Sequence, residues 1–286
     1  MKQLPVVFRR HRCVEALLVS GFTFVGALFA APDPAALWSP RALLFFVASY
    51  LVIISIYAFN SWAGLREDRA NPRLAAAGFG SEREYAAVSA GTLAGALAFF
   101  AFLRPAAIPY ALGIFFLWGL YSFPRYGAKY VPLAGTIVHI AVGITQFQQG
   151  WALIGEPGMR SLLLSLYFAL ILSAGHVNHE LIDHDADRAA GIASGAVRFG
   201  IRRWILLHLG IAVSGASLLI VLYGAGWWGF PQSLPFLVAS LLHTASASTL
   251  LRGELRQHRF LRHRAFYRFL YGAACLCTLV VGPPYA

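Results

Sequence analysis

The stretch LLFFVASYLVIISIYAFN, residues 43–60, contains no charged side chain and is followed at once by the polar segment SWAGLREDR, residues 61–69. An apolar run of this length is about what a helix needs to cross the hydrocarbon core of a bilayer. Because backbone groups cannot be left unpaired in lipid, the run is predicted to be helical. The whole chain has a similar character: 58% of its 286 residues are hydrophobic, 12% are charged and the mean hydropathy is +0.64. These values exclude an ordinary soluble domain and indicate an integral membrane protein.

Similar apolar runs recur from one end of the chain to the other. We therefore predict an all-α fold, a polytopic membrane helical bundle of about nine transmembrane helices. No long hydrophilic segment divides the chain, so residues 1–286 are expected to form a single membrane domain. The predicted spans are Cys13–Ala30, Leu43–Asn60, Tyr85–Leu103, Ile108–Phe123, Tyr130–Phe147, Leu162–Asn178, Ile205–Tyr223, Leu234–Leu250 and Tyr267–Val281.

The basic residues indicate how the chain is oriented. In the nine-span arrangement, 20 of the 23 lysine and arginine side chains fall on one side of the membrane, and only Arg41, Arg104 and Arg160 fall on the other. The positive-inside rule then places the N-terminus and the longer polar loops in the cytoplasm and the C-terminus on the opposite side. The net charge of +11 is explained by this topology, so we expect no nucleic-acid partner.

The segment ELIDHDAD, residues 180–187, carries a stripe of acidic side chains. Glu180, Asp183 and Asp187 are spaced i, i+3 and i+7, which puts them on one face of a helix. Clustered carboxylates repel one another unless a cation lies between them, and Mg²⁺ typically combines one or two carboxylates with substrate phosphate oxygens. The stripe therefore favours a Mg²⁺ site. The alternative is an acidic helix end in water, relieved by Arg188.

Histidines beside this stripe also allow a zinc interpretation. HELID resembles the HExxH zinc motif, but Asp183 stands where the second histidine belongs, so a ligand is missing. A zinc hydrolase is therefore disfavoured. His176, His179 and His184 are expected to hydrogen-bond to neighbouring side chains or to phosphate.

Two further polar segments are predicted on the same cytoplasmic face. Asn60 ends the second span and Asp68 follows it, although a solvated loop of alternating charge is the simpler interpretation of that segment alone. Arg125 and Lys129 lie in LYSFPRYGAKYVP, residues 120–132, between the fourth and fifth spans. Acidic groups that need a metal, basic groups that need an anion and apolar helices beneath them together describe a site for a metal-bound diphosphate with a hydrocarbon tail.

Three motifs carry a resemblance to a known family: NSWAGLRED at residues 60–68, YSFPRYGAK at 121–129 and ELIDHDADRAAGIASGAVRFG at 180–200. In order and position they resemble the motifs of the UbiA superfamily of intramembrane prenyltransferases. The resemblance implies a Mg²⁺-dependent transfer of a prenyl group from its diphosphate to a hydrophobic acceptor, an aromatic ring or a lipid. It implies catalytic roles for Asp183, Asp187 and Lys129, metal ligation by Glu180, Asp183, Asp187, Asn60 and Asp68, and substrate binding by Asn60, Asp68, Tyr121, Arg125, Arg12, Arg66 and Arg69.

The first motif departs from the family pattern NDxxDxxxD. Ser61 and Gly64 stand where the family has aspartates, so two of its three carboxylates are missing. A metal at this motif should bind weakly, and Arg66 and Arg69 are expected to contact phosphate in its place. Two alternatives stay open: a noncatalytic relative that binds an isoprenoid or quinone, and a UbiA-type terpene cyclase. A transporter is disfavoured because the acidic groups cluster at one membrane face instead of the midplane.

Overall fold

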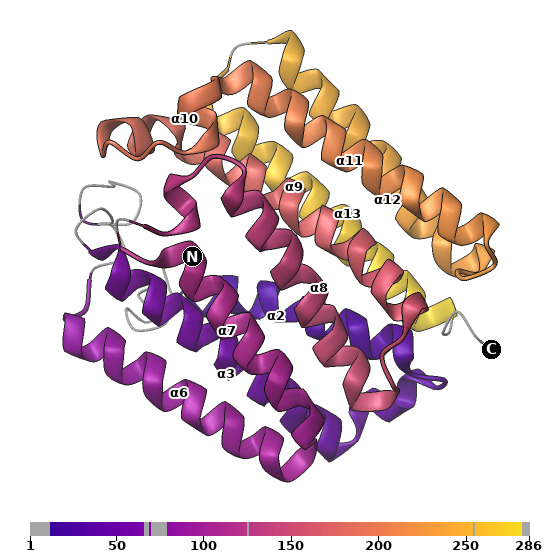
Figure 1. Ribbon diagram of the computed structural model, residues 1–286. Coiled ribbons are helices and arrows are strands. Elements are labelled where there is room, and N and C mark those ends of the chain that lie inside the picture. The colour runs from indigo at the N-terminus through magenta and orange to yellow at the C-terminus, as the bar shows by residue number, and fades with distance from the viewer. Residues whose placement is uncertain (1–11, 66–68, 70–78, 125, 254, 282–286) are drawn as a thin grey trace.

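Long helices packed side by side form most of the described part of the protein (Figure 1). The computed structural model describes residues 12–65, 69, 79–124, 126–253 and 255–281, and this part contains no strand. Nine described helices have fifteen residues or more: α2 (Cys13–Ala30), α3 (Pro40–Ala63), α6 (Glu82–Leu103), α7 (Ile108–Ser122), α8 (Ala134–Ile154), α9 (Met159–Ala189), α11 (Ile201–Gly224), α12 (Phe230–Thr249) and α13 (Gln257–Val281). Shorter pieces are α10 (Gly195–Phe199) and the 3₁₀ turns η1 (Pro34–Trp38), η2 (Pro105–Ala107), η3 (Ala128–Tyr130) and η4 (Leu250–Arg252).

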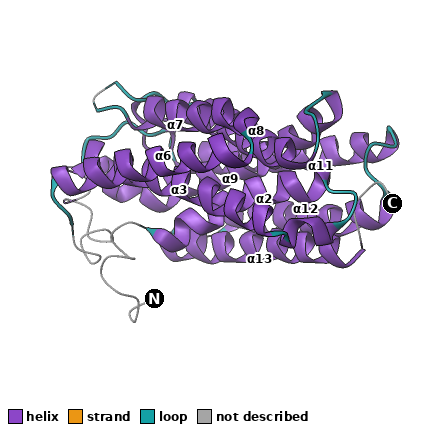
Figure 2. Cartoon of the chain, turned by 90° about the horizontal axis from the view of Figure 1, so that it is seen from below, coloured by secondary structure: helices purple, strands orange, loops and turns teal. Residues whose placement is uncertain are grey.

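The predicted all-helical membrane bundle is confirmed. In the described part of the chain, eight helices are long and apolar enough to cross a membrane, with η2 and α7 counted together as Pro105–Ser122. Figure 2 shows the long helices running along a common direction, with the connecting loops gathered at the two ends of the bundle. The ninth long helix, α8, is less apolar because it carries Gln146, Gln148 and Gln149, all of them buried.

Buried amides of this kind belong in the interior of the bundle, because lipid offers them no partner. Gln148 receives a hydrogen bond from Ser161 and donates one to Ser165, both on α9. Gln149 accepts a hydrogen bond from Thr23 on α2 at 3.4 Å. The glutamines thus lie within α8, which runs over Ala134–Ile154 instead of the predicted Tyr130–Phe147.

Glycines let α8 approach its neighbours closely. A Cβ on Gly26 of α2 would collide with the Phe147 carbonyl, and a Cβ on Gly150 would collide with the Thr23 carbonyl. Between α8 and α9, a Cβ on Gly143 would lie 2.8 Å from the Ala169 Cα. Small residues at such contacts allow backbones to pack together in membrane bundles, where association depends largely on van der Waals contact.

α9 extends further than the predicted span. It was expected to end at Asn178 but continues to Ala189, so the acidic stripe lies on a helix that is continuous with a span. Neither glycine nor proline interrupts this extension. The chain turns away after Ala189 at Gly191, whose φ of +72° is in the left-handed region that glycine adopts readily. The Ile192 N–H donates back to the Asp187 carbonyl at 2.9 Å.

α13 likewise begins earlier than predicted, at Gln257 instead of Tyr267. Its arginine-rich first half is helical because long basic side chains can reach water from one face while the other face packs inward. Phe260, His263 and Tyr267 form that inward face and are all buried.

Candidate active site

The acidic stripe of α9 is paired with histidines of the same helix. Glu180 Oε1 lies 3.1 Å from His176 Nε2, and Asp183 Oδ2 lies 3.5 Å from His179 Nε2. The side chains of Glu180 and Asp183 are only 11% and 15% exposed. His176 and His179 thus lie within ion-pair distance of carboxylates, and the expected hydrogen bond to a neighbouring side chain is present for His184, whose Nδ1 lies 2.8 Å from Asp185 Oδ1. Glu180 and Asp183 form a partly buried polar edge instead of a fully solvated helix end.

Glu180 is the most enclosed of the acidic groups. The backbone N–H groups of Gly195 and Ala196, at the start of α10, face its carboxylate. A Cβ on Gly195 would overlap the ring of Trp204, so glycine is required where α10 passes this close. Glu180 Oε2 is buried and has no hydrogen-bond partner among the described residues. A buried carboxylate oxygen without a donor is suited to a hard cation such as Mg²⁺.

Rings from α7, α8 and α9 pack next to Glu180. His139 of α8 stacks on His176 with ring centroids 3.8 Å apart, and Tyr121 of α7 stands edge-on to both. Gly135 makes room for this contact, since a Cβ there would lie 3.1 Å from His176 Nε2 and 3.2 Å from the Tyr121 ring. His139 Nδ1 is 2.7 Å from the Gly135 carbonyl, which can only accept, so Nδ1 carries the proton.

His139 was missed by sequence reasoning. The available signal was an ionisable side chain within an apolar segment, which marks a functional candidate in a membrane protein. Trp118 completes the group, with its ring centroid 4.7 Å from that of His139.

Tyr121 shows which charged groups come together at this end of the bundle. Its hydroxyl experiences the charges of Glu180, Asp183, Asp187 and Arg12. The structure therefore brings the predicted acidic motif of α9, the tyrosine that ends α7 and the arginine that precedes α2 into one electrostatic environment.

Three arginines act electrostatically on Tyr57 of α3. The Arg12 guanidinium lies 5.8 Å from the Tyr57 ring centroid, and the charges of Arg264 and Arg268 of α13 also act on this tyrosine. Sequence reasoning had assigned these two α13 arginines to membrane topology alone. Their spacing of four residues, which places them on one helix face, was the signal that they act together.

A narrow pocket lies between α2, α3 and α7 at the same end. It is lined by Val19, Ile53, Ile56, Tyr57, Asn60 and Trp118. The pocket is small, and its lining is apolar except for Asn60 and the polar tips of its aromatic residues.

The other predicted residues are less closely tied to this group. Lys129 is half-buried in η3, with Nζ 4.8 Å from the Tyr130 ring centroid, and η3 packs against α7 and α8. Arg69 is exposed. The predicted roles of Arg66, Asp68 and Arg125 fall on residues outside the described ranges.

The substituted positions of the first motif both lie inside the bundle. Ser61 is 5% exposed and Gly64 is buried. Ser61 can therefore offer only a neutral oxygen to the interior, and Gly64 offers no side chain.

Comparison with known proteins gives a consistent picture. Residues 19–278 match the sequence model of the UbiA prenyltransferase family. No curated protein sequence matches the chain. A UbiA homologue from Archaeoglobus fulgidus, solved bound to GPP and Mg²⁺, is 18% identical, with a TM-score of 0.74 over 95% of this chain and 100% of its own.

Two further solved structures are similar. A digeranylgeranylglyceryl phosphate synthase is 18% identical, with a TM-score of 0.70 over 98% of both chains. A UbiA homologue from Aeropyrum pernix K1, solved in the apo state, is 21% identical, with a TM-score of 0.69 over 92% of this chain and 97% of its own. At these identities the likeness establishes a shared fold.

Proposed function

Because the chain belongs to the UbiA prenyltransferase family, we propose that it transfers a prenyl group from an allylic prenyl diphosphate to an aromatic or lipid acceptor and releases diphosphate. The observation that carries this proposal is that the α9 carboxylates and Arg12 all act on Tyr121, whose ring contacts Trp118 in the wall of an apolar pocket. In this arrangement the acidic groups would hold the metal ion, the basic groups would bind the diphosphate, and the apolar surface would contact the hydrocarbon tail.

Mg²⁺ is the cofactor that this donor set fits. Glu180, Asp183 and Asp187 would hold it, and the unpartnered Glu180 Oε2 supports that assignment. Asn60 and Asp68 would supply the opposite side of the site. When bound, the ion supplies positive charge against the diphosphate oxygens.

The side chains of this chain have the remaining tasks. Arg12 and Lys129 bind diphosphate oxygens, with Arg66, Arg69 and Arg125 as further basic groups from the motif loops. As the allylic C–O bond breaks, its electron pair leaves with the diphosphate, and these cations stabilise the developing negative charge.

The carbon cation formed at the same time is protected by the pocket. The rings of Tyr57 and Trp118, which line the pocket, can stabilise a cation over their faces, and the apolar walls exclude water. The acceptor then supplies an electron pair for the new bond and loses a proton, which the released diphosphate can take.

The membrane orientation forms part of the same proposal. Because 20 of the 23 basic side chains fall on one side of the nine-span arrangement, the N-terminus and the active-site loops face the cytoplasm and the C-terminus faces the opposite side. The prenyl diphosphate, a water-soluble anion at one end, then enters from the cytoplasm.

A noncatalytic lipid-binding relative is the second candidate, and the loss of carboxylates at Ser61 and Gly64 favours it. Such a protein would bind an isoprenoid or quinone through the same pocket without releasing diphosphate. A cyclase of the same superfamily would release diphosphate without any acceptor.

The test is diphosphate release by the purified protein in lipid, with a panel of allylic prenyl diphosphates, with and without Mg²⁺ and acceptors. We expect Mg²⁺-dependent release that Asp183→Asn and Asp187→Asn abolish. Asp185→Asn is the matched control, because Asp185 is on the same helix but 96% exposed. Release without an acceptor and a cyclic product would identify a cyclase. No release from any donor would contradict the proposal and favour the lipid-binding relative.

A further inference from the structure

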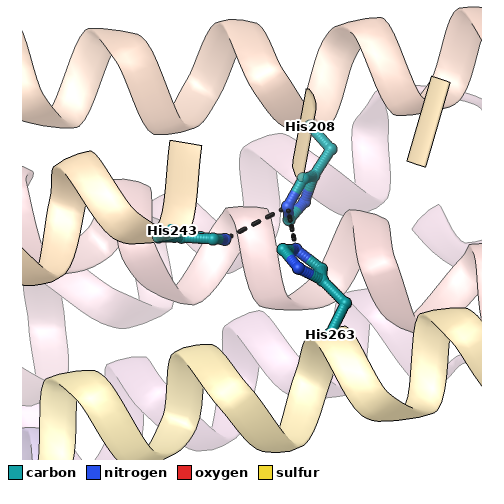
Figure 3. Close-up of side chains that lie close together, drawn as sticks. All are labelled: His208, His243 and His263. Carbon is teal, nitrogen blue, oxygen red and sulfur yellow. Dashed lines mark hydrogen bonds between the residues drawn. The ribbon is translucent and has the colours of Figure 1, made fainter. Parts of the chain in front are cut away.

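Three histidines from three different helices converge away from the acidic stripe. His208 of α11, His243 of α12 and His263 of α13 are 0%, 1% and 4% exposed. Their candidate ligand atoms all lie within 4.8 Å of one another, and Figure 3 shows the rings directed toward a common point. His208 Nε2 lies 2.9 Å from His263 Nε2 and 3.1 Å from His243 Nε2.

Each imidazole is held on its other nitrogen by an oxygen atom. Nδ1 of His208 lies 2.9 Å from the Ala174 carbonyl, Nδ1 of His243 lies 3.2 Å from the Tyr271 hydroxyl, and Nδ1 of His263 lies 2.9 Å from Ser246 Oγ. Histidines that bind metals are typically oriented in this way, with the non-ligating nitrogen donating to an oxygen.

The protonation of His208 is determined by its partner. A backbone carbonyl can only accept, so Nδ1 of His208 carries the proton and Nε2 presents a lone pair to the other two rings. One lone pair in the ring plane can accept only one well-aligned hydrogen bond, yet two nitrogens approach it. Without a cation, either both Nε2–H groups of His243 and His263 compete for the His208 lone pair, or a lone pair of one ring faces that of His208. Both arrangements are costly in a buried site.

We propose that His208, His243 and His263 form a binding site for a divalent transition-metal ion, with Zn²⁺ as the principal candidate. Three neutral imidazoles suit zinc, copper and nickel, whereas Mg²⁺ requires oxygen ligands. This site is therefore chemically distinct from the carboxylates of α9. It takes a different metal and lies on different helices.

The geometry needs little adjustment to accept the ion. Zinc–nitrogen distances of 2.0–2.1 Å in a tetrahedral site separate the ligand nitrogens by about 3.3 Å. The His208–His263 and His208–His243 nitrogen pairs, at 2.9 and 3.1 Å, would move apart by a few tenths of an ångström. The ligand atoms of His243 and His263, which lie within 4.8 Å of each other, would adjust to the same separation.

A bound ion would join the last three long helices of the bundle to one another. It would also stiffen their attachment to α9, since the carbonyl that orients His208 belongs to Ala174. Glu180 is six residues further along the same helix, a rise of about 9 Å. The site thus supports the helix that carries the proposed catalytic carboxylates without contributing a ligand to them.

The test measures metal binding itself. Full-length protein in detergent is stripped with a chelator and incubated with Zn²⁺ or Co²⁺ in excess Mg²⁺, which occupies the carboxylates. Bound metal is then measured after gel filtration, and Co²⁺ is also followed by its visible absorption. We expect about one ion per chain, with the intense spectrum of a tetrahedral site. His243→Ala and His263→Ala should remove this ion, and His258→Ala, an exposed position on α13, should not.

Milder variants keep the test informative if an alanine variant fails to fold. Tyr271→Phe and Ser246→Ala retain all three imidazoles but remove an Nδ1 partner, and we expect them to bind the metal roughly 10- to 100-fold more weakly. Folded wild-type protein that binds neither ion would overturn the proposal. Binding that is unchanged in folded His243→Ala and His263→Ala would also overturn it, and would place the metal elsewhere. Neither readout depends on prenyl transfer, so the two proposals can fail separately.

Discussion

Replacing Glu180 with glutamine tests the central role of the acidic stripe. The substitution keeps the size of the side chain and one carbonyl oxygen but removes a negative charge from a group that is 11% exposed. Its Oε2, which has no hydrogen-bond partner among the described residues, becomes either a neutral oxygen or an NH₂ group that cannot bind a cation. Loss of one such electrostatic contribution typically costs roughly 10²- to 10³-fold in turnover, or about 2.7–4 kcal/mol of barrier.

We therefore expect Glu180→Gln to lower the rate of diphosphate release by that factor and to raise the Mg²⁺ concentration for half-maximal rate at least ~10-fold. The assay is a Mg²⁺ titration of diphosphate release, with thermal unfolding measured in parallel to show that the bundle is intact. Asp185→Asn, a charge loss on the exposed face of the same helix, is the matched control. If Glu180→Gln and Asp185→Asn have the same rate and the same Mg²⁺ requirement, Glu180 is not a metal ligand.

Three further experiments test other parts of the structure. Arg264→Gln and Arg268→Gln should each raise KM for the prenyl diphosphate about 10-fold, because a hydrogen bond to a charged group contributes roughly 1.5–3 kcal/mol. Arg262→Gln removes a charge of the same helix that is not among those acting on Tyr57, so it should leave KM unchanged. Equal KM values for all three variants would remove the α13 arginines from the site. Gly135→Ala should separate Tyr121 from His176 by a few tenths of an ångström. We expect kcat to fall severalfold while the melting temperature stays nearly unchanged. An unaltered kcat would show that this ring contact is not needed for turnover. Gly150→Ala should lower the free energy of unfolding by about 1–3 kcal/mol, because its Cβ has no space against Thr23. The control Gly210→Ala, whose Cβ would meet no atom within 4 Å, should leave the free energy of unfolding unchanged. Equal thermal stability of the two variants would contradict the close packing of α2 on α8.

The helical bundle was predictable because hydropathy responds directly to the bilayer. The predicted end of α8 was wrong because polar side chains there form hydrogen bonds to other helices inside the bundle. Gln146, Gln148 and Gln149 made α8 look as if it ended near Phe147, but serines of α9 and Thr23 of α2 provide hydrogen bonds to two of them. Hydropathy summed along one segment cannot detect a partner on another helix.

The candidate site was predictable to the extent that it is local in sequence. Glu180, Asp183 and Asp187 share a helix face by spacing alone, and the structure has them on α9. His139 and the three clustered histidines were not predictable in the same way. His208, His243 and His263 come from three helices and are brought together only by tertiary packing, so each one alone resembles an isolated polar residue in an apolar segment.

The distribution of charge bears on how the proposed diphosphate site would work without the aspartates of the first motif. On the α9 side, the carboxylates can share a cation with the substrate. On the α3 side, Ser61 and Gly64 provide no carboxylate, but the positive charges of Arg12, Arg264 and Arg268 act on Tyr57, which lines the same pocket as Asn60. Guanidinium groups bind phosphate oxygens directly and need no metal between them. We therefore expect positive charge from these arginines to take the role that a second metal ion, held by the missing aspartates, would have. Arg264 and Arg268 are then as informative to substitute as the acidic stripe.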